Sequence, residues 1–413
     1  MSGRRVAVTG LGVVTPLGNC ISDVFDALEA GRSAVRRLPP ALARQLRAPI
    51  AATVQFDGAA HFPGAHLRQL DRVSQMALVA AAQAVTDAGI DFASERRERC
   101  GVFVGSSLGG VESTDEGYRV LYAPEQGRVK PYTVITAMTS APAAWIGIEY
   151  SLTGPNLTFS TACSSSAVAL GEAARRIGGG EADVMLAGGT EAPLSAGVLA
   201  AWDAMRTLAT EDPIDASASC RPFASTRSGL VLAEGAAFVV LEDWQHALRR
   251  GAPIHAELAG YGLTSDVAHI TRPTVEGQAA AMRAALDSAQ LAPEDVDYIN
   301  AHGTATLQND AVETAAIKQV LGARAYAIPV SSTKSMHGHL LGAAGALEFA
   351  IAVVALERGL VPPTMHLNSP DPACDLDYVA EGARRGARLR AVMSNSFAFG
   401  GTNAALIARS ADR

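Results

Sequence analysis

The sequence predicts an α/β fold built from two similar halves. Short runs of β-branched and apolar residues alternate with longer stretches of helical periodicity, a pattern typical of sheets covered by helices. Each half also contains a β-like run, a polar turn and then a helix of small and apolar residues: TACSSSAVALGEAARRI from Thr161, and STKSMHGHLLGAAGALEFAIAVVAL from Ser332. Because these two helices are apolar nearly all round, we expect both at the centre of the fold.

The individual elements follow from the same patterns. Short apolar runs predict strands at 5–9, 102–105, 157–160, 184–187 and 237–241, then at 254–261, 296–300, 327–331, 391–394 and 404–408. Helical periodicity predicts helices over 74–88, 166–178, 276–289, 311–321 and 341–358. We therefore expect one half over residues 1–250 and the other over 251–413, meeting near 249–253.

The composition excludes several classes of protein. Of 413 residues 48% are hydrophobic and 18% charged, which favours a large core and excludes global disorder. A formal net charge of −7 argues against nucleic acids and anionic membranes as partners. The apolar stretch from Leu340 is interrupted by Glu348, which favours a buried helix over a membrane span. The start, MSGRRVAVTG, has no apolar signal region, so we expect a soluble, cytoplasmic protein.

The cysteines argue against both a disulfide framework and a zinc site. They are odd in number and scattered, with no CxxC spacing: Cys20, Cys100, Cys163, Cys220 and Cys374.

Two glycine motifs resemble functional loops. TGLGVVTPLG, which begins at Thr9, has Thr15 where a dinucleotide loop has its third glycine, so we expect a structural turn. GSSLG, which begins at Gly105, matches the nucleophile elbow of a hydrolase with Ser107 as nucleophile. Such an elbow needs a helix directly after it, whereas residues 110–112 predict a polar loop.

Cys163 is a candidate nucleophile because it lies where a predicted strand ends and a predicted helix begins. The positive end of a helix dipole lowers a thiol pKa, and small neighbours leave room for a substrate. A buried, inert cysteine is the commoner case, so the residue alone leaves both interpretations open.

Histidines and a lysine gather in two further turns. AHGTAT carries His302 after a predicted strand, and STKSMHGHLLGAAG carries Lys334, His337 and His339. Catalytic groups of open α/β sheets collect in turns of this kind. His337 and His339 are two residues apart and have no carboxylate cluster beside them, so no metal site is predicted.

Four motifs taken together carry a family resemblance: TACSSS, AHGTAT, STKSMHGHLLGAAG and NSFAFGGTN. The chain resembles the β-ketoacyl-[acyl carrier protein] synthases of type II, and also the ketosynthases of type II polyketide systems. The resemblance covers almost the whole chain. It implies a thiolase-like fold, with two similar α/β halves forming a five-layered α-β-α-β-α core, and a homodimer.

The resemblance also implies catalytic roles. The family's nucleophile falls on Cys163, its two histidines on His302 and His339, and its lysine on Lys334. Its oxyanion hole falls on the backbone amides of Cys163 and Phe399, and Phe399 matches the aromatic gate that moves when the acyl chain enters.

Supporting groups follow in the same way. Glu348 matches a buried acid near the lysine, and Asp310 matches an acid in the loop after the first histidine. Thr304 and Thr306 match hydroxyls that hold the phosphopantetheine arm.

Pocket and partner residues are the last that the resemblance supplies. Leu108 and Met138 match positions that line the acyl pocket, the second near the partner subunit, although ordinary core packing would also account for both. Acyl carrier proteins are acidic, so a basic face is needed on this acidic chain. The candidates by position are Arg68, Arg72, Arg128, Lys130 and Arg206.

Five positions depart from the family's pattern without removing a catalytic group: Ala305, Leu307, Gln308, His337 and Ala398. Because of these departures, the family's gate motion and acyl-length preference do not transfer directly to this chain. We interpret His337 as a packing or dimer-side residue rather than a third catalyst.

The implied activity is decarboxylative condensation of an acyl thioester on Cys163 with malonyl-carrier, giving a 3-oxoacyl-carrier and CO2. No metal or nucleotide cofactor is implied, since the substrates are carried on the phosphopantetheine of an acyl carrier protein. Fatty acid synthesis is the leading pathway. A specialised polyketide or polyene pathway, with or without a partner subunit, a non-catalytic partner of another ketosynthase, and a Ser107 hydrolase are the alternatives.

Overall fold

A computed structural model describes residues 3–44, 46–123 and 127–411. Its main sheet has the strand order β10-β9-β13-β14-β8-β1-β7-β6-β4-β5. All ten strands expected from the sequence are present in it, most of them a few residues longer or shorter than expected. The bounds are β1 (Val6–Val14), β4 (Cys100–Gly105), β5 (Asn156–Phe159), β6 (Val184–Glu191), β7 (Gly235–Asp243), β8 (Ala256–Ser265), β9 (Tyr298–Asn300), β10 (Val330–Ser331), β13 (Ala391–Phe397) and β14 (Thr402–Ser410).

The strand pairing repeats between the two halves. In the first, β4 runs parallel to β5 and β6, and β6-β7-β1 continue antiparallel. In the second, β9 runs parallel to β10 and β13, and β13-β14-β8 continue antiparallel. A short antiparallel contact between β1 and β8 joins them, pairing Ala7 with Glu257 and Val8 with Ala256. The boundary near 249–253 stays a prediction.

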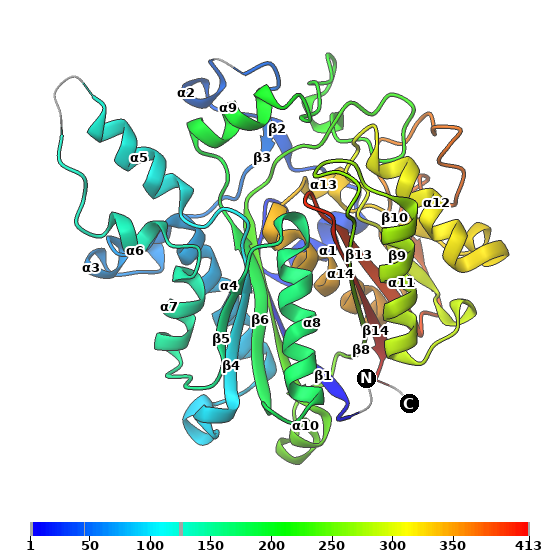
Figure 1. Ribbon diagram of the computed structural model, residues 1–413, viewed down its shortest axis with the longest axis horizontal. Helices are drawn as coiled ribbons and strands as arrows, with labels where there is room; N and C mark the ends of the chain where they lie inside the picture. The colour runs from blue at the N-terminus through cyan, green and yellow to red at the C-terminus, as the bar shows by residue number, and fades with distance from the viewer. Residues whose placement is uncertain (1–2, 45, 124–126, 412–413) are drawn as a thin grey trace.

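Helices complete five layers, which Figure 1 shows from left to right. Helices α4 and α7 cover the outer face of the first five strands, α8 and α14 lie between the two sets of strands, and α11 and α12 cover the second set. The thiolase-like arrangement is thereby confirmed. The bounds are α4 (Arg72–Ala88), α7 (Ala141–Glu149), α8 (Ser165–Gly178), α11 (Val275–Ala289), α12 (Asn309–Leu321) and α14 (Ala344–Arg358).

Shorter elements surround this core. The helices are α1 (Ile21–Glu29), α2 (Pro40–Ala43), α3 (Gly64–Leu67), α5 (Val111–Leu121), α6 (Thr133–Ala137), α9 (Ala196–Ala204), α10 (Trp244–Arg250) and α13 (Lys334–His337). Two small hairpin sheets are β2 (Val35–Arg37) with β3 (Ile50–Ala52), and β11 (Leu360–Val361) with β12 (Arg384–Arg385).

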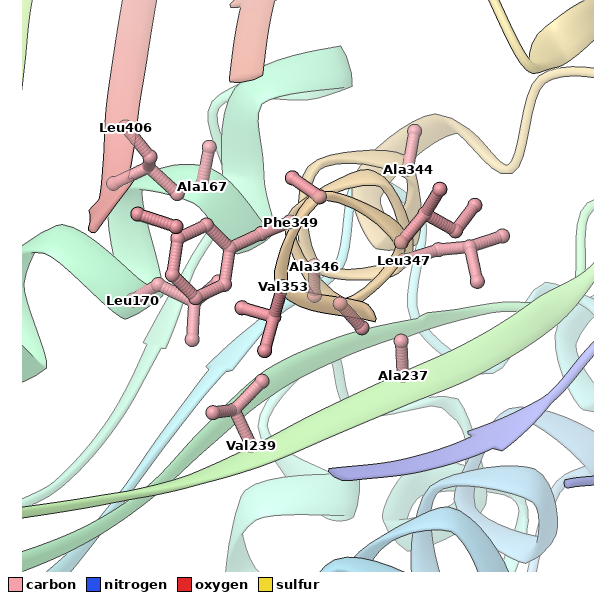
Figure 2. Close-up of a cluster of buried hydrophobic side chains, with 14 of the residues drawn as sticks. Ala167, Leu170, Ala237, Val239, Ala344, Ala346, Leu347, Phe349, Val353 and Leu406 are labelled. Carbon is pink, nitrogen blue, oxygen red and sulfur yellow. The ribbon is translucent and has the colours of Figure 1, made fainter. Parts of the chain in front are cut away.

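The central layer is as apolar as the sequence predicts. Figure 2 shows α14 surrounded by side chains of α8, β7 and β14, with Phe349 and Val353 facing Leu170, Val239 and Leu406. All but the last two residues of α14 are buried. The membrane-like stretch from Leu340 is therefore a core helix. Within the described ranges, no helix has the length and hydropathy that crossing a membrane would require.

Two local expectations need correction. The motif that begins at Thr9 is a turn only in its second half, where Thr15 pairs with Gly18. Its first half continues β1: Cβ atoms at Gly10 and Gly12 would lie 2.1 and 2.0 Å from carbonyl oxygens of α4, so glycine lets the helix approach the strand. The segment after GSSLG is not a polar loop either, because α5 begins at Val111.

Candidate active site

A cavity of about 470 Å³ opens where segments of both halves meet. Cys163 comes from the start of α8, His302 from the turn after β9, and His339 from the turn after α13. The remaining lining residues belong to 205–207, 228–230, 269–273, 304–309 and 397–401. Residues far apart in the sequence therefore share one solvent-connected hollow.

Cys163 lies in a 3-10 turn, η4 (Ala162–Ser164), directly before α8. Its neighbour Ala162 has a φ of 50°, a left-handed conformation that is strained for alanine and turns the chain sharply. The side chain is only 6% exposed. The structure thus presents the thiol at a sharp turn before the helix, as the sequence predicts.

The lowered pKa that the sequence predicts for the Cys163 thiol is wrong. Burial raises the pKa of the thiol to about 12, while the Lys334 ammonium and the backbone N–H groups of Phe399 and Cys163 act in the opposite direction. Desolvation exceeds these attractions because little water reaches the sulfur. The two N–H groups nevertheless face the sulfur, where an oxyanion hole is expected.

His302 and His339 complete a triangle with Cys163. Their rings are 5.4 Å apart and nearly perpendicular, and one nitrogen of each ring and the Sγ atom lie within 4.8 Å of one another. Burial first, and the Lys334 ammonium second, hold the pKa of both imidazoles well below the ordinary value. Both rings are therefore neutral and carry one N–H each. The Nδ1 atoms of both rings and Nε2 of His339 are buried and have no hydrogen-bond partner within the described residues.

Lys334 and Glu348 form a buried ion pair beside this triangle. Their side chains are 1% and 0% exposed. Burial raises the pKa of Glu348 to about 7, although the Lys334 ammonium opposes the shift. A thiol and two imidazoles are also a donor set that zinc accepts, but a fixed ammonium that acts on all three disfavours a resident cation.

Glu313 is a supporting residue that the sequence analysis missed. Its two carboxylate oxygens accept the backbone N–H groups of His302 and Gly303, each at 2.8 Å, and so fix the turn that carries the imidazole. Asp310 lies in the first turn of α12 rather than in a loop, and it accepts the N–H of Phe223 at 2.8 Å. Burial raises the pKa of Asp310 to about 7.

Thr304 and Thr306 line the cavity, and their hydroxyls are 3.0 Å apart. Arg227 holds this segment from behind: its guanidinium donates to the carbonyls of Thr306 and Leu307. Arg227 is another missed residue, because an isolated arginine carries no sequence signal for such a role.

Phe399 lies in a tight turn at the edge of the cavity, before two glycines with φ values of 85° and 82°. Its ring stacks on Trp202 of α9, with centroids 6.1 Å apart and an angle of 22°. The turn is tied to the neighbouring loop by a hydrogen bond from the Gly400 N–H to the Ile270 carbonyl, at 2.7 Å.

Comparisons with known proteins identify the family to which the chain belongs. Residues 3–247 match the family model "Beta-ketoacyl synthase, N-terminal domain", and residues 255–368 match "Beta-ketoacyl synthase, C-terminal domain". The chain belongs to the β-ketoacyl synthase family. It is therefore a condensing enzyme of the acyltransferase type.

Individual relatives agree with this assignment. This β-ketoacyl synthase is 44% identical to "Nodulation protein E" of Rhizobium meliloti (strain 1021) over 403 residues, with 98% of each chain covered. It is 43% identical to "3-oxoacyl-[acyl-carrier-protein] synthase 2" of Coxiella burnetii over 410 residues, covering 98% of this chain and 99% of the relative. A solved type II PKS ketosynthase, in complex with its acyl-carrier protein and bound to a hexaketide, matches with a TM-score of 0.91 at 32% identity. The match covers 99% of this chain and 100% of the solved chain.

The pocket and departure residues of this β-ketoacyl synthase lie in different surroundings. Leu108 is half-buried and packs on the apolar cluster that contains Cys163. Met138 is 41% exposed and does not line the cavity. His337 is buried, with its ring nitrogens hydrogen-bonded to Thr333 Oγ1 at 2.9 Å and to the Gly338 carbonyl at 2.7 Å. It is therefore a packing residue.

The structure separates the five basic candidates. Arg68, Arg128 and Lys130 line one small surface hollow, and Arg206 lies at the main cavity. Arg72 is held inward by a two-point ion pair with Glu234, with both N–O distances 2.8 Å, so its guanidinium is not a free surface charge.

Ser107 does not resemble a hydrolase nucleophile in its contacts. Its hydroxyl donates to the Ala162 carbonyl at 2.9 Å, and its backbone N–H donates to Glu191 at 2.7 Å. These bonds make Ser107 a brace behind the Cys163 turn. The hydrolase alternative is not supported.

Proposed function

We propose that Cys163 accepts the acyl group and that His302, His339 and Lys334 complete the catalytic set of this condensing enzyme. The observation that carries this proposal is the triangle of one thiol and two neutral imidazoles inside a solvent-connected cavity. No metal or nucleotide takes part in the proposed reaction.

In the first half-reaction, the Cys163 sulfur attacks the thioester of an acyl carrier. Lys334 and the two facing N–H groups stabilise the developing thiolate, and the thiol proton leaves with the carrier's sulfur. The same N–H groups receive the negative oxygen of the tetrahedral intermediate, a contribution of about 3 kcal/mol per donor in comparable sites.

In the second half-reaction, malonyl-carrier loses CO2 and becomes an enolate. Neutral imidazoles suit this step, because each offers an N–H to the enolate oxygen without protonating the carbon that must react. The carbanion then attacks the acyl group on Cys163. The product is a 3-oxoacyl-carrier two carbons longer, and the Cys163 thiolate that is released takes up a proton from solvent.

The proposed partners are an acyl carrier protein and a second copy of the chain, acting in the cytoplasm. Arg68, Arg128, Lys130 and Arg206 are the basic groups we assign to carrier contact. Exposed apolar side chains support a covered surface near Met138, among them Val134 at 74% and Leu157 of the edge strand β5 at 46%. A related subunit in place of the second copy is the alternative.

We assign the reaction to fatty acid biosynthesis. A specialised polyketide pathway is the second candidate, favoured by Ala305, which adopts a φ of 63° where the family often has glycine, and by the likeness to a type II PKS ketosynthase. An acyl-length series separates the two: saturated chains elongated with similar efficiency favour fatty acid synthesis, and preference for oxidised or unsaturated chains favours a specialised pathway.

The roles themselves are tested with Cys163→Gln. The variant should lose condensation but still decarboxylate malonyl-carrier, because the imidazoles are intact. Full condensation by this variant would refute the assignment of Cys163.

A further inference from the structure

Glu191, at the end of β6, is a fully buried carboxylate that the proposed reaction does not use. Its Oε2 atom accepts the backbone N–H of Ser107 at 2.7 Å and that of Gly342 at 3.0 Å. Its Oε1 atom accepts the N–H of Leu108 at 3.0 Å and the hydroxyl of Ser106 at 3.3 Å. The four donors belong to two separate turns, so one carboxylate holds these turns against each other.

The two turns belong to different halves of the fold. Ser107 and Leu108 follow β4 in the first half, whereas Gly342 lies in the 3-10 turn η8 (Leu341–Ala343) of the second half. The approach is close, because a Cβ atom at Gly342 would lie 2.5 Å from Glu191 Oε2 and 2.6 Å from the backbone nitrogen of Ser107. Glycine at this position therefore lets the two halves meet across the carboxylate.

Each turn is also connected to a group of the proposed catalytic set. On one side, the Ser107 hydroxyl donates to the Ala162 carbonyl at 2.9 Å, directly before Cys163. On the other side, Gly342 lies three residues after His339 in the same segment. The carboxylate thus joins the turn that carries the thiol to the segment that carries one imidazole.

We propose that Glu191 is a positioning residue that keeps His339 within 4.8 Å of the Cys163 sulfur. The inference rests on the proposed function, in which an enolate formed at the imidazoles attacks the acyl group on the thiol. A displacement of about 1 Å between reacting groups costs about 100-fold in rate. A buried bridge between the halves would therefore keep decarboxylation coupled to condensation.

Loss of this bridge has a chemical signature. After malonyl-carrier loses CO2, the enolate carbon either attacks the acyl group on Cys163 or takes up a proton from solvent. The first path gives one 3-oxoacyl-carrier for each CO2, and the second gives acetyl-carrier. The ratio of CO2 released to 3-oxoacyl-carrier formed therefore reports on the placement of the two groups and not on the amount of folded protein.

The test uses the purified full chain, a medium-chain acyl carrier and malonyl-carrier, and records CO2 release together with the masses of the carrier products. The wild-type ratio should be near one. Glu191→Gln replaces one acceptor oxygen by a donor, so it should raise the ratio at least about threefold and lower the condensation rate about 10- to 100-fold. Gly342→Ala should also raise the ratio, because its Cβ atom separates the turns while the carboxylate is intact.

Glu242→Gln is the matched control. Glu242 of β7 is also 0% exposed, but it is hydrogen-bonded to His246 and Arg250 of α10, at the end of the molecule opposite α13 (Figure 1). This variant should unfold at a lower urea concentration than wild type and leave the ratio near one. A raised ratio here would overturn the proposal, since loss of stability alone would then uncouple the reaction.

The remaining outcomes separate this inference from the proposed function. A ratio near one in Glu191→Gln overturns the positioning role, even where the condensation rate falls, because the loss is then merely structural. If Glu191→Gln yields no folded protein, the ratio in Gly342→Ala decides in the same way. A wild-type protein that forms no acyl adduct on Cys163 overturns the proposed function instead.

Discussion

The buried ion pair of Lys334 and Glu348 makes a sharp prediction about stability and pH. Lys334→Met removes the ammonium and leaves a carboxyl that is 0% exposed without its partner. Glu348 Oε2 already has no hydrogen-bond partner within the described residues, so nothing else there compensates the charge. Breaking a buried pair in this way costs about 3–5 kcal/mol of unfolding free energy.

The pH dependence follows from the pKa of Glu348, which burial raises to about 7 in the intact pair. Above pH 7 the wild-type carboxyl is ionised in both the folded and the unfolded state, so it does not make the free energy of unfolding depend on pH. Without the ammonium its pKa rises further, and the folded variant keeps a proton that the unfolded chain releases. The variant should therefore lose about 1.4 kcal/mol of stability per pH unit above 7, relative to wild type.

Urea unfolding followed by tryptophan fluorescence, at pH 7, 8 and 9, measures both effects. Lys334→Met/Glu348→Leu is the control: it removes both charges and should recover most of the stability while leaving condensation impaired. Unchanged stability of the single variant would refute the buried ion pair. Wild-type condensation by the double variant would show that the pair is structural only.

Three further predictions concern other parts of the molecule. Glu313→Leu removes the acceptor of two backbone N–H groups in the His302 turn. In steady-state assays the variant should lower kcat about 10- to 100-fold with a smaller change in KM. Equal changes in kcat and KM would contradict a positioning role for Glu313. Burial lowers the pKa of His255, but hydrogen bonds to two carboxylates outweigh it and raise that pKa to about 9. The protonated imidazole therefore contributes up to about 3 kcal/mol to the free energy of unfolding below pH 6.5, and this contribution is lost as the pH rises through 9. Urea midpoints of wild type and His255→Gln should accordingly differ at pH 6.5 and converge at pH 10. Ala305→Gly removes the backbone strain of an alanine in the left-handed conformation and should stabilise the fold by about 0.5–1 kcal/mol. A lower midpoint of urea unfolding in this variant would contradict strain at Ala305.

The sequence predicts what depends on local pattern. The ten main strands, the central helices and the Cys163 turn are recognisable because β-like runs lead through polar turns into helices of small residues. Long-range packing is not recognisable in this way. The strand that continues through Gly10 has the composition of a turn, and only the approach of α4 explains its glycines.

Other features could not be predicted because they depend on tertiary packing. Helix α5 buries only Gly117 among its described residues and is polar on average, so its sequence resembles that of a polar loop. Glu313 is recognisable only once α12 places it under the His302 turn. The pKa of Cys163 depends on how little water reaches the sulfur, and the position of the residue before a helix does not reveal that.

The central claim is that Cys163 carries the acyl group during condensation. The most direct measurement mixes the purified protein with a medium-chain acyl carrier, adds malonyl-carrier, and records intact masses of protein and carrier. We predict one acyl adduct on Cys163, lost when malonyl-carrier is added, with a 3-oxoacyl-carrier two carbons longer. Product formed without that adduct, or an adduct on another residue, would contradict the account.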